Sequence, residues 1–252
     1  MTKYGWPQVV AFPVIILAGM IIIALFGIKL LSPAIILFLE LILVLVLIWA
    51  LAFFRDPSRE CPSDENLLLS PADGKITEIE TIEENDYLDT PSIKIGIFLS
   101  IFNVHINRAP CNAKVKKITY KKGQYKNAMN PESSRVNESN ELQLVRTASP
   151  QDKLIVKQIS GAIARRIVCK VGQGDELGAG EQFGMIKFGS RTELYVPAHS
   201  NKGNENTGIT GNTANSKENI GRDLYQIKCL VKKGDTVKAG ITPLLRYEKC
   251  VE

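Results

Sequence analysis

Two long apolar stretches near the N-terminus constrain the fold of this chain most. Residues 9–28 read VVAFPVIILAGMIIIALFGI, and residues 34–54 read AIILFLELILVLVLIWALAFF. At about 1.5 Å of rise per residue, each stretch is long enough as a helix to cross about 30 Å of hydrocarbon. In the short turn between them, Ser32 and Pro33 suit the N-cap and first position of the second helix. We therefore expect a tight transmembrane hairpin with both ends on one side of the membrane.

The charges around this hairpin predict its orientation. Lys3 precedes it and Arg55 and Arg59 follow it, whereas only Lys29 lies in the turn. The positive-inside rule then places both ends, and the rest of the chain, on the cytoplasmic side of the cell membrane. A cleaved signal peptide is the alternative for the first stretch, but that stretch is long for one and a second span follows directly. The role of Glu40, the one ionisable residue in the spans, is left open.

Beyond the hairpin the sequence is typical of a mainly β domain. Short β-branched runs broken by glycine, asparagine and proline predict strands over residues 92–106, 114–123, 154–160, 163–171, 192–197 and 224–234. We therefore divide the chain into a membrane hairpin over residues 1–59 and a β domain over residues 60–252. Residues 199–222 have almost no apolar side chains and predict a mobile surface insertion. The formal net charge of +5 gives no reason to expect nucleic acid as a partner.

An internal repeat narrows the fold further. VGQGDELGAG (residues 171–180) and VKKGDTVKAG (residues 231–240) share V-x-x-G-D-x-[LV]-x-A-G. The Gly-Asp pair suits a tight turn with strands on either side, so we expect two related hairpins. The pattern resembles the lipoyl and biotinyl carrier domains, which implies a barrel-sandwich hybrid fold. It implies no carrier function, because neither copy has the lysine motif that is modified in those domains.

The cysteines give no sign of a metal site. Cys61, Cys111, Cys169, Cys229 and Cys250 are odd in number and scattered, without C-x-x-C pairs or histidines at metal-ligand spacing. We expect neither a bound metal nor a disulfide framework, in agreement with a reducing compartment.

Three polar residues lie in apolar surroundings. Asp73 occupies a turn in SPADGKITEI, His105 lies within FLSIFNVHINRAP, and Ser190 follows Gly189 in KFGSRTELYVP. Each taken alone is most simply structural: a generic turn, a strand histidine and a polar Gly-Ser turn. Together, aspartate, histidine and serine can supply the orienting group, base and nucleophile of a proton relay. No G-x-S-x-G nucleophile elbow accompanies them.

Six segments then carry a family resemblance. FFRDPSR, SPADGK, NVHINRAP, NESNEL, GAIARRIV and FGMIKFGSR occur in this order between residues 53 and 191. They closely resemble the motifs of the phosphatidylserine decarboxylase family, specifically its short membrane-hairpin branch. The resemblance implies that the Gly189–Ser190 bond cuts itself into a large and a small chain. It also implies that Ser190 becomes a covalent pyruvoyl cofactor, the electron sink that decarboxylation needs.

The same resemblance assigns roles. It implies that Asp73 orients and charges His105, and that His105 takes the proton from Ser190 and later helps protonate the decarboxylated intermediate. The implied reaction converts phosphatidylserine to phosphatidylethanolamine at the surface of the bilayer. Two features depart from the family pattern: Phe102 stands where longer relatives have a second histidine, and an insertion follows Pro197.

Other interpretations remain open at this point. Archaetidylserine or another serine phospholipid presents the same reacting headgroup. A non-enzymatic, membrane-anchored barrel-sandwich adaptor would fit the fold, but it would not explain FGSR together with Asp73 and His105. A serine hydrolase could use the three residues on an external ester. Lysines in residues 114–126 suit either an anionic membrane surface or a solvated strand face, and homo-oligomerisation is left open.

Overall fold

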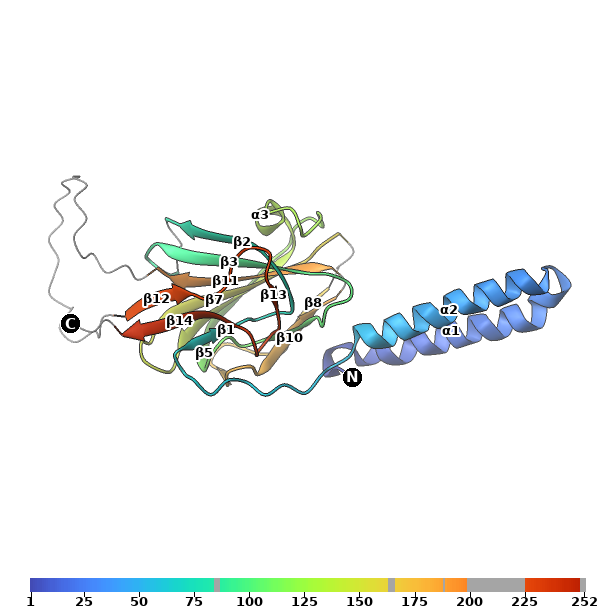
Figure 1. The fold of residues 1–252 in the computed structure, drawn as a ribbon, viewed down its shortest axis with the longest axis horizontal. Coiled ribbons are helices and arrows are strands. Elements are labelled where there is room, and N and C mark those ends of the chain that lie inside the picture. The colour runs from blue at the N-terminus through green and yellow to red at the C-terminus, as the bar shows by residue number, and fades with distance from the viewer. Residues whose placement is uncertain (84–86, 163–165, 188, 199–224, 250–252) are drawn as a thin grey trace, which may run out of the picture.

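Two N-terminal helices extend from a β domain (Figure 1). The computed structural model describes residues 1–83, 87–162, 166–187, 189–198 and 225–249. Helices α1 (Trp6–Phe26) and α2 (Pro33–Phe53) pack side by side, with the 3₁₀ turns η1 (Lys3–Gly5) before α1 and η2 (Gly27–Lys29) between them. Ser32 is the N-cap residue of α2 and Pro33 its first residue. The predicted two-helix hairpin is thus confirmed.

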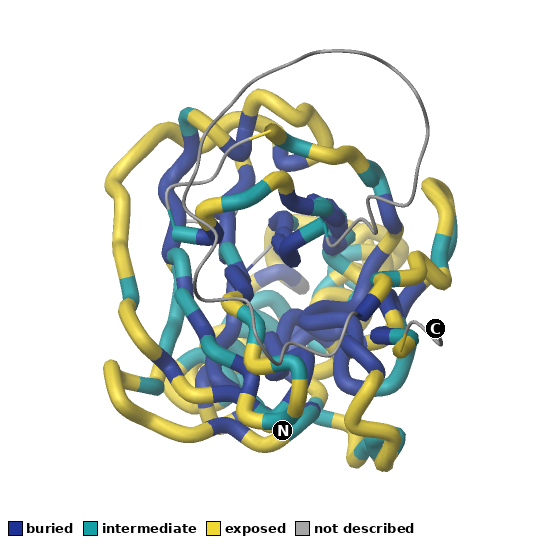
Figure 2. The backbone as a smooth tube through the Cα atoms, turned by 90° about the vertical axis from the view of Figure 1, so that its left-hand side faces the viewer, coloured by how far each residue is buried: buried dark blue, intermediate teal, exposed yellow. Residues whose placement is uncertain are grey.

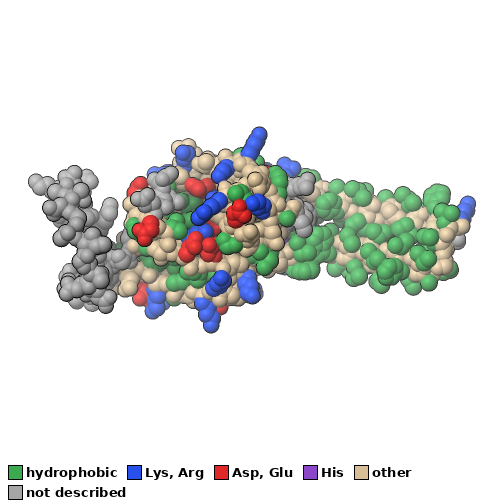
Figure 3. All heavy atoms as spheres, turned by 90° about the horizontal axis from the view of Figure 1, so that it is seen from above, with side chains coloured by type: hydrophobic (Ala, Val, Ile, Leu, Met, Phe, Trp, Pro, Cys, Tyr) green, Lys and Arg blue, Asp and Glu red, His purple; other side chains and the backbone are tan. Residues whose placement is uncertain are grey.

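Apolar side chains cover the outside of the hairpin (Figure 3). Both helices are long and apolar enough to cross a membrane by length and composition. Ile15 and Leu37, for example, are 65% and 71% exposed. An apolar surface of this extent is unfavourable in water and favours lipid as the surroundings. The Oε1 atom of Glu40 is buried and has no hydrogen-bond partner among the described residues.

The base of the hairpin is fixed to the β domain. Tyr4, Phe53 and Phe54 form one apolar cluster with Val104, Ile106 and Met185 of the β domain. The amide of Thr2 donates to the carbonyl of Phe54 at 2.9 Å, and the Tyr4 hydroxyl donates to the carbonyl of Gln182 at 3.0 Å. The Thr2 bond closes the base of the hairpin, and the Tyr4 bond and the apolar cluster join that base to the β domain.

The described part of the β domain contains one eight-stranded antiparallel sheet and two three-stranded sheets. The large sheet has the order β13-β2-β3-β11-β7-β6-β5-β9, and it curls around a buried interior (Figure 2). Its strands are β2 (Gly74–Ile82), β3 (Ser92–Leu99), β5 (Ala113–Lys121), β6 (Ser139–Arg146), β7 (Lys153–Ile159), β9 (Glu176–Leu177), β11 (Ser190–Pro197) and β13 (Thr236–Val237). Because successive side chains of a strand point to opposite faces, most of these strands bury one face in a common core.

Two smaller sheets and one short helix complete the domain. One sheet has the order β1-β14-β12 and the other β4-β10-β8. Their strands are β1 (Leu67–Leu69), β4 (Ile106–Arg108), β8 (Ile167–Cys169), β10 (Gln182–Ile186), β12 (Tyr225–Cys229) and β14 (Pro243–Lys249), and the helix is α3 (Ser133–Val136). The predicted mainly β fold is confirmed. Strands β1, β6, β10 and β14 were not predicted, and Cys250 and residues 199–222 lie outside the described residues.

The two repeat copies form equivalent turns. Gly174 and Gly234 have φ of +94° and +101°, which glycine adopts at little cost. In each turn an aspartate accepts a backbone hydrogen bond, Asp175 at 2.8 Å and Asp235 at 2.9 Å. The expectation that each copy closes a paired hairpin is wrong, because the strand after each turn is two residues long and pairs elsewhere. Strand β9 pairs with β5 and β13 with β2, so the copies occupy the two edges of the large sheet.

The prediction of one strand over residues 92–106 is also wrong. Strand β3 ends at Leu99 and β4 begins at Ile106. Between them, the Asn103 side-chain oxygen accepts hydrogen bonds from the amide and the hydroxyl of Ser100, both at 2.8 Å. Such local side-chain bonds to the backbone compete with strand pairing and favour a turn. His105 therefore lies at the end of a loop and not in the middle of a strand.

Candidate active site

Ser190 is the first residue of β11, a central strand of the large sheet. It lies opposite Leu99 of β3, and the next residue, Arg191, lies opposite Ile159 of β7 on the other side. Gly189 before it has φ of +59°, in the left-handed region that favours glycine. The Ser190 side chain is fully buried, and its hydroxyl has no hydrogen-bond partner in the described part of the chain. A buried hydroxyl without a hydrogen-bond partner is energetically costly, which singles out Ser190 as a candidate functional residue.

His105 faces the peptide group of Gly189. Its Nδ1 atom lies 2.9 Å from the carbonyl oxygen of Asn103, which can only accept, so Nδ1 carries the proton. The unprotonated Nε2 atom accepts the backbone N–H of Gly189 at 3.3 Å. Burial lowers the pKa of His105 to about 4, although the Asn103 hydrogen bond and the charge of Asp73 act in the opposite direction. His105 is therefore neutral, and able to act as a base, at neutral pH.

The end of the apolar hairpin packs against His105. The ring of Phe53, the last residue of α2, lies 4.4 Å from the imidazole ring, centroid to centroid, with a tilt of 36°. His105 has no exposed surface. The burial that lowers the pKa of His105 thus depends in part on the last residue of α2.

Asp73 lies near His105 but is bonded to other groups. Its carboxylate receives two hydrogen bonds from the Arg59 guanidinium, at 2.6 and 2.8 Å. It also accepts the amide of Ala239 at 2.8 Å. Among the described residues, no hydrogen bond joins Asp73 to His105. The group that orients the ring is the carbonyl of Asn103, and Asp73 acts on His105 through its charge.

The internal repeat explains one of these bonds. Ala239 and Ala179 are corresponding residues of the two repeat copies. The amide of Ala179 donates to the side-chain oxygen of Asn112 at 2.8 Å, as the amide of Ala239 does to Asp73. Asp73 therefore has a structural role, capping a repeat turn, that an amide side chain fulfils in the other copy.

A chain of buried amides fixes β4 against β11. Asn107 donates to the hydroxyl of Thr192 at 3.0 Å and accepts from Gln158 at 2.9 Å. Asn107 lies two residues after His105, and Thr192 lies two residues after Ser190. Although β4 and β11 belong to different sheets, these bonds set the position of the histidine relative to the serine.

Gly161 lies directly against the carbonyl group of Gly189. A Cβ atom at position 161 would overlap the Gly189 carbonyl oxygen and approach the carbonyl carbon to 3.0 Å. The residue before it is held firmly, because the Asn137 amide donates to the carbonyl of Ser160 at 2.8 Å. Gly161 thus packs directly against the peptide bond between Gly189 and Ser190, with no room for a side chain.

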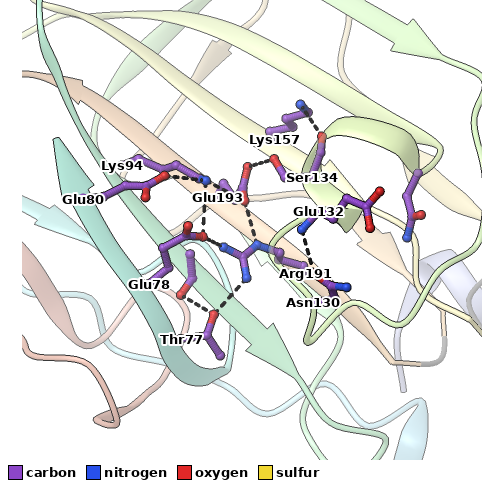
Figure 4. Close-up of polar contacts among 12 residues, drawn as sticks. Thr77, Glu78, Glu80, Lys94, Asn130, Glu132, Ser134, Lys157, Arg191 and Glu193 are labelled. Atoms are coloured by element: carbon purple, nitrogen blue, oxygen red, sulfur yellow. Dashed lines mark hydrogen bonds and ion pairs between the residues drawn. The ribbon is translucent and has the colours of Figure 1, made fainter. Parts of the chain in front are cut away.

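A buried charge network surrounds the outer face of β11 next to Ser190 (Figure 4). Arg191 pairs with Glu78 and with Glu193, the latter at 2.6 Å, and donates to the hydroxyl of Thr77 at 3.0 Å. Lys94 lies 3.2 Å from Glu78 and 3.7 Å from Glu193. Arg191 and Glu193 are both fully buried, so the loss of either partner would leave an uncompensated buried charge.

Hydrogen bonds complete this network. The carboxylate of Glu193 accepts the Ser134 hydroxyl at 2.7 Å and the Tyr195 hydroxyl at 2.6 Å. Burial would raise the pKa of Glu193, but Arg191, Lys94 and these two hydroxyls together hold it below its ordinary value. Glu193 is therefore charged, and the strand that begins at Ser190 is anchored on its outer face as well as by its two neighbours.

Sequence reasoning proposed three residues for this site, and other residues that lie here were not among them. It identified Asp73, His105 and Ser190, and the structure brings His105 and Gly189 into direct contact. It missed Arg59 and Gly161, although both lie within the segments that carried the family resemblance. Within the described residues, no group of three histidine, cysteine or acidic side chains could hold a metal ion.

The arrangement is that of an enzyme: a neutral, oriented imidazole contacts the backbone N–H of Gly189, the residue before a serine whose hydroxyl has no partner among the described residues, and both side chains are buried. A family model described as phosphatidylserine decarboxylase matches residues 46–243. The chain therefore belongs to the phosphatidylserine decarboxylase family, as its sequence motifs predicted.

Individual relatives agree with this assignment, and each is named phosphatidylserine decarboxylase proenzyme. The protein of Carboxydothermus hydrogenoformans is 37% identical over 210 residues, covering 83% of this chain and 85% of the relative. That of Syntrophus aciditrophicus is 40% identical over 192 residues, 76% of each chain. That of Desulfotalea psychrophila is 42% identical over 159 residues, 63% of this chain and 73% of the relative.

The first prediction concerns Gly161. We expect Gly161→Ala to slow any reaction at the Gly189 carbonyl by roughly 10- to 100-fold, because a displacement of about 1 Å at a reacting group has effects of this size. The matched control is Gly178→Ala, whose Cβ would lie 3.7 Å from the nearest atom, an ordinary contact. Cleavage between residues 189 and 190 is followed on gels, with circular dichroism as the check on folding. Equal cleavage rates in the two variants would remove the proposed steric role.

The second prediction separates the two roles of Asp73. Asp73→Asn should retain the cap on Ala239, because Asn112 makes the equivalent bond in the other repeat copy. Asp73→Ala should lose the cap and leave the Ala239 amide unpaired, which costs about 1–3 kcal/mol. Both variants lose the charge of Asp73, so the difference between their free energies of unfolding reports the hydrogen bonds that an amide oxygen at position 73 can still accept, from Ala239 and from Arg59. Denaturant unfolding measures it, and identical midpoints would contradict the assignment of this bond.

Proposed function

We propose that the chain is a precursor that cuts its own Gly189–Ser190 bond and then decarboxylates phosphatidylserine to phosphatidylethanolamine at a membrane surface. The observation that carries the proposal is the unprotonated Nε2 atom of His105, 3.3 Å from the nitrogen of Gly189, the residue before Ser190, whose buried hydroxyl has no partner among the described residues. The names of the relatives support the substrate and the proenzyme state. Archaetidylserine shares the reacting headgroup and stays an alternative substrate.

Self-cleavage begins with attack of the Ser190 oxygen on the carbonyl carbon of Gly189. His105 takes the hydroxyl proton and returns it to the departing Ser190 nitrogen, so that the amide becomes an ester. Loss of the Ser190 α-proton then expels the Gly189 carboxylate and leaves a dehydroalanine residue at position 190. Water replaces its nitrogen, which departs as ammonia, and a pyruvoyl group remains. The larger chain then ends at Gly189, and the smaller chain begins at position 190.

The surroundings of position 190 fit such a group. A pyruvoyl group supplies a ketone that can condense with an amine and accept the electron pair released when carbon dioxide leaves. The cut removes only the connection to Gly189, whereas β11 stays paired with β3 and β7. Arg191 stays fixed by Glu78, Glu193 and Thr77. The chain thus holds the new N-terminus in place, and His105 is available to hold or deliver a proton beside it.

Asp73 serves this chemistry through its charge. In the relay implied by the sequence resemblance, Asp73 stabilises the positive charge that His105 acquires on taking a proton, and its charge raises the pKa of His105. Orientation of the ring is supplied by the carbonyl of Asn103. Arg59 balances the aspartate in the resting state, which limits how far Asp73 can raise the histidine pKa.

The hairpin supports a location at a membrane. Both helices are long and apolar enough to cross a bilayer, and the end of α2 contacts His105 itself. The distribution of lysine and arginine favours the cytoplasmic side of the cell membrane for the catalytic domain. An active site held at the bilayer surface reaches a lipid headgroup without extracting the lipid.

The direct test of this function combines protein and lipid chemistry. The purified wild-type protein should consist of two chains, and mass analysis should find a pyruvoyl group at position 190. It should release carbon dioxide from phosphatidylserine in detergent micelles. Ser190→Ala should stay full length and inactive, because the nucleophile is absent. A single intact wild-type chain that still decarboxylates the lipid would overturn the mechanism, and two chains without lipid activity would overturn the substrate.

The pH dependence of self-cleavage tests the role of His105. The base is active when unprotonated, and its pKa is lowered from 6.5 to about 4. The cleavage rate of freshly translated precursor should therefore stay level from about pH 8 to pH 5.5 and fall only near pH 4. Asp73→Asn should move this fall to lower pH, because the Asp73 charge raises the histidine pKa. A fall centred at pH 6.5 would show that the histidine is not buried as described.

Two controls accompany this profile. His105→Ala should nearly abolish cleavage at neutral pH, with a residual rate that rises with pH as hydroxide replaces the base. Stability must be followed as well, since the unfolded chain binds a proton on His105 near pH 6.5 and the folded chain only near pH 4. The free energy of unfolding thus decreases as the pH falls through this window, and circular dichroism at each pH separates unfolding from loss of the base.

A further inference from the structure

Lys187 and Arg166 form an uncompensated cationic pair close to Ser190. Ile186 of β10 lies opposite Ile167 of β8, and the next residues along, Lys187 and Arg166, continue the pairing through a backbone bond of 3.2 Å. Like charges opposite each other on neighbouring strands are destabilising. In the described part of the chain, no ion pair joins either residue to a carboxylate.

The burial of Lys187 adds to the destabilising effect of its charge. The residue is only 6% exposed, and its ammonium group donates to the neutral side chain of Gln8, in α1, at 2.9 Å. Burial, followed by the charge of Arg166, lowers the pKa of Lys187. Burying an ammonium group without a counter-charge costs free energy, and a bound anion would offset that cost.

The position of Lys187 and Arg166 indicates which kind of anion could bind there. Gln8 belongs to the base of the membrane hairpin, so the Lys187 ammonium lies where the β domain meets the apolar helices. Lys187 is three residues before Ser190, which limits their Cα separation to about 10 Å. A third cation, Arg55, lies on the histidine side, where its charge lowers the pKa of His105. The guanidinium of Arg55 binds the carbonyls of Ala52 and Phe102, both at 2.7 Å.

We propose that Lys187, with Arg166 beside it, binds the phosphodiester of the lipid headgroup and thereby sets the serine part of the substrate against position 190. This inference rests on the proposed function and adds the recognition of phosphate to it. Lysine suits the task because its ammonium is a compact point charge with three donors. Arg166 is exposed and can approach the same phosphate from the solvent side.

The chemistry of the reaction predicts which kinetic constant depends on this contact. Decarboxylation breaks the bond to the headgroup carboxylate and leaves the phosphodiester unchanged. An interaction with the phosphodiester is therefore equally strong in the ground state and the transition state. Removing such an interaction raises KM and leaves kcat unchanged.

The experiment uses the full-length mature protein in detergent micelles with a varied mole fraction of phosphatidylserine. We expect Lys187→Met to raise KM by about 10-fold with kcat within about two-fold, as befits one hydrogen bond to a charged group. Lys187→Arg should restore most of the affinity. Should Lys187→Met fail to mature, Arg166→Gln serves instead, with a smaller rise in KM. An unchanged KM in the variant that matures would overturn the proposal.

Two controls separate binding of phosphate from a structural role. Gln8→Leu removes the partner of Lys187 in α1, so an equal rise in KM there would mean that the lysine only docks the hairpin. Lys228→Met removes an exposed lysine that pairs with Glu248, and it should leave KM unchanged. A wild-type protein that matures but has no lipid activity would refute the proposed function itself, and not this site alone.

Inorganic phosphate distinguishes the source of the anion. If the site holds the headgroup, phosphate should inhibit the wild type competitively at high concentration and inhibit Lys187→Met much less. Inhibition that is lost in the variant while the lipid KM is unchanged would indicate a site for free phosphate, and would overturn the assignment to the headgroup.

Discussion

The central position of β11 is the constraint on which the rest of the site depends. Ser190 begins a strand that is hydrogen-bonded on both sides. The sheet therefore fixes the position of the Ser190 end of the Gly189–Ser190 peptide bond. The charge network of Arg191 and Glu193 reinforces the same strand from its outer face. A reactive group at residue 190 can therefore be held within the small tolerance that catalysis requires. Gly189 adopts a left-handed conformation that only glycine takes at little cost, and the buried Ser190 hydroxyl, without a partner among the described residues, lies directly after it.

Burial is the second physical constraint, and it links the apolar hairpin to the candidate active site. Phe53 is the last residue of α2 and also packs on the imidazole of His105. The same burial keeps the histidine neutral and strengthens charge interactions within the site. Lys187, which has no carboxylate partner among the described residues, donates to Gln8 at the same interface, so the contact between hairpin and β domain bears on both residues. Changes at the base of the hairpin are expected to affect reactivity as well as attachment.

The internal repeat gives the site its frame. Its two copies lie at opposite edges of the large sheet, and each ends in an alanine amide capped by a polar side chain. In one copy the cap is Asn112, in the other Asp73. One turn of a symmetrical scaffold thus carries a charge where its counterpart carries an amide, and that charge lies close enough to His105 to influence its pKa. Structural and chemical roles are combined in the same aspartate.

The sequence by itself determined the apolar two-helix hairpin, the mainly β domain, the repeat and three candidate site residues, because apolar length, strand alternation and turn chemistry are local properties. It also indicated the family, since each of the motifs around Asp73, His105 and Ser190 is a continuous stretch of sequence. Only the tertiary structure decided which groups touch: Asn103 and not Asp73 orients His105. It also decided that Arg59 pairs with Asp73, and that Gly161 stands against the Gly189 carbonyl. These contacts join residues brought together by sheet closure, and no local pattern encodes the register in which distant strands meet.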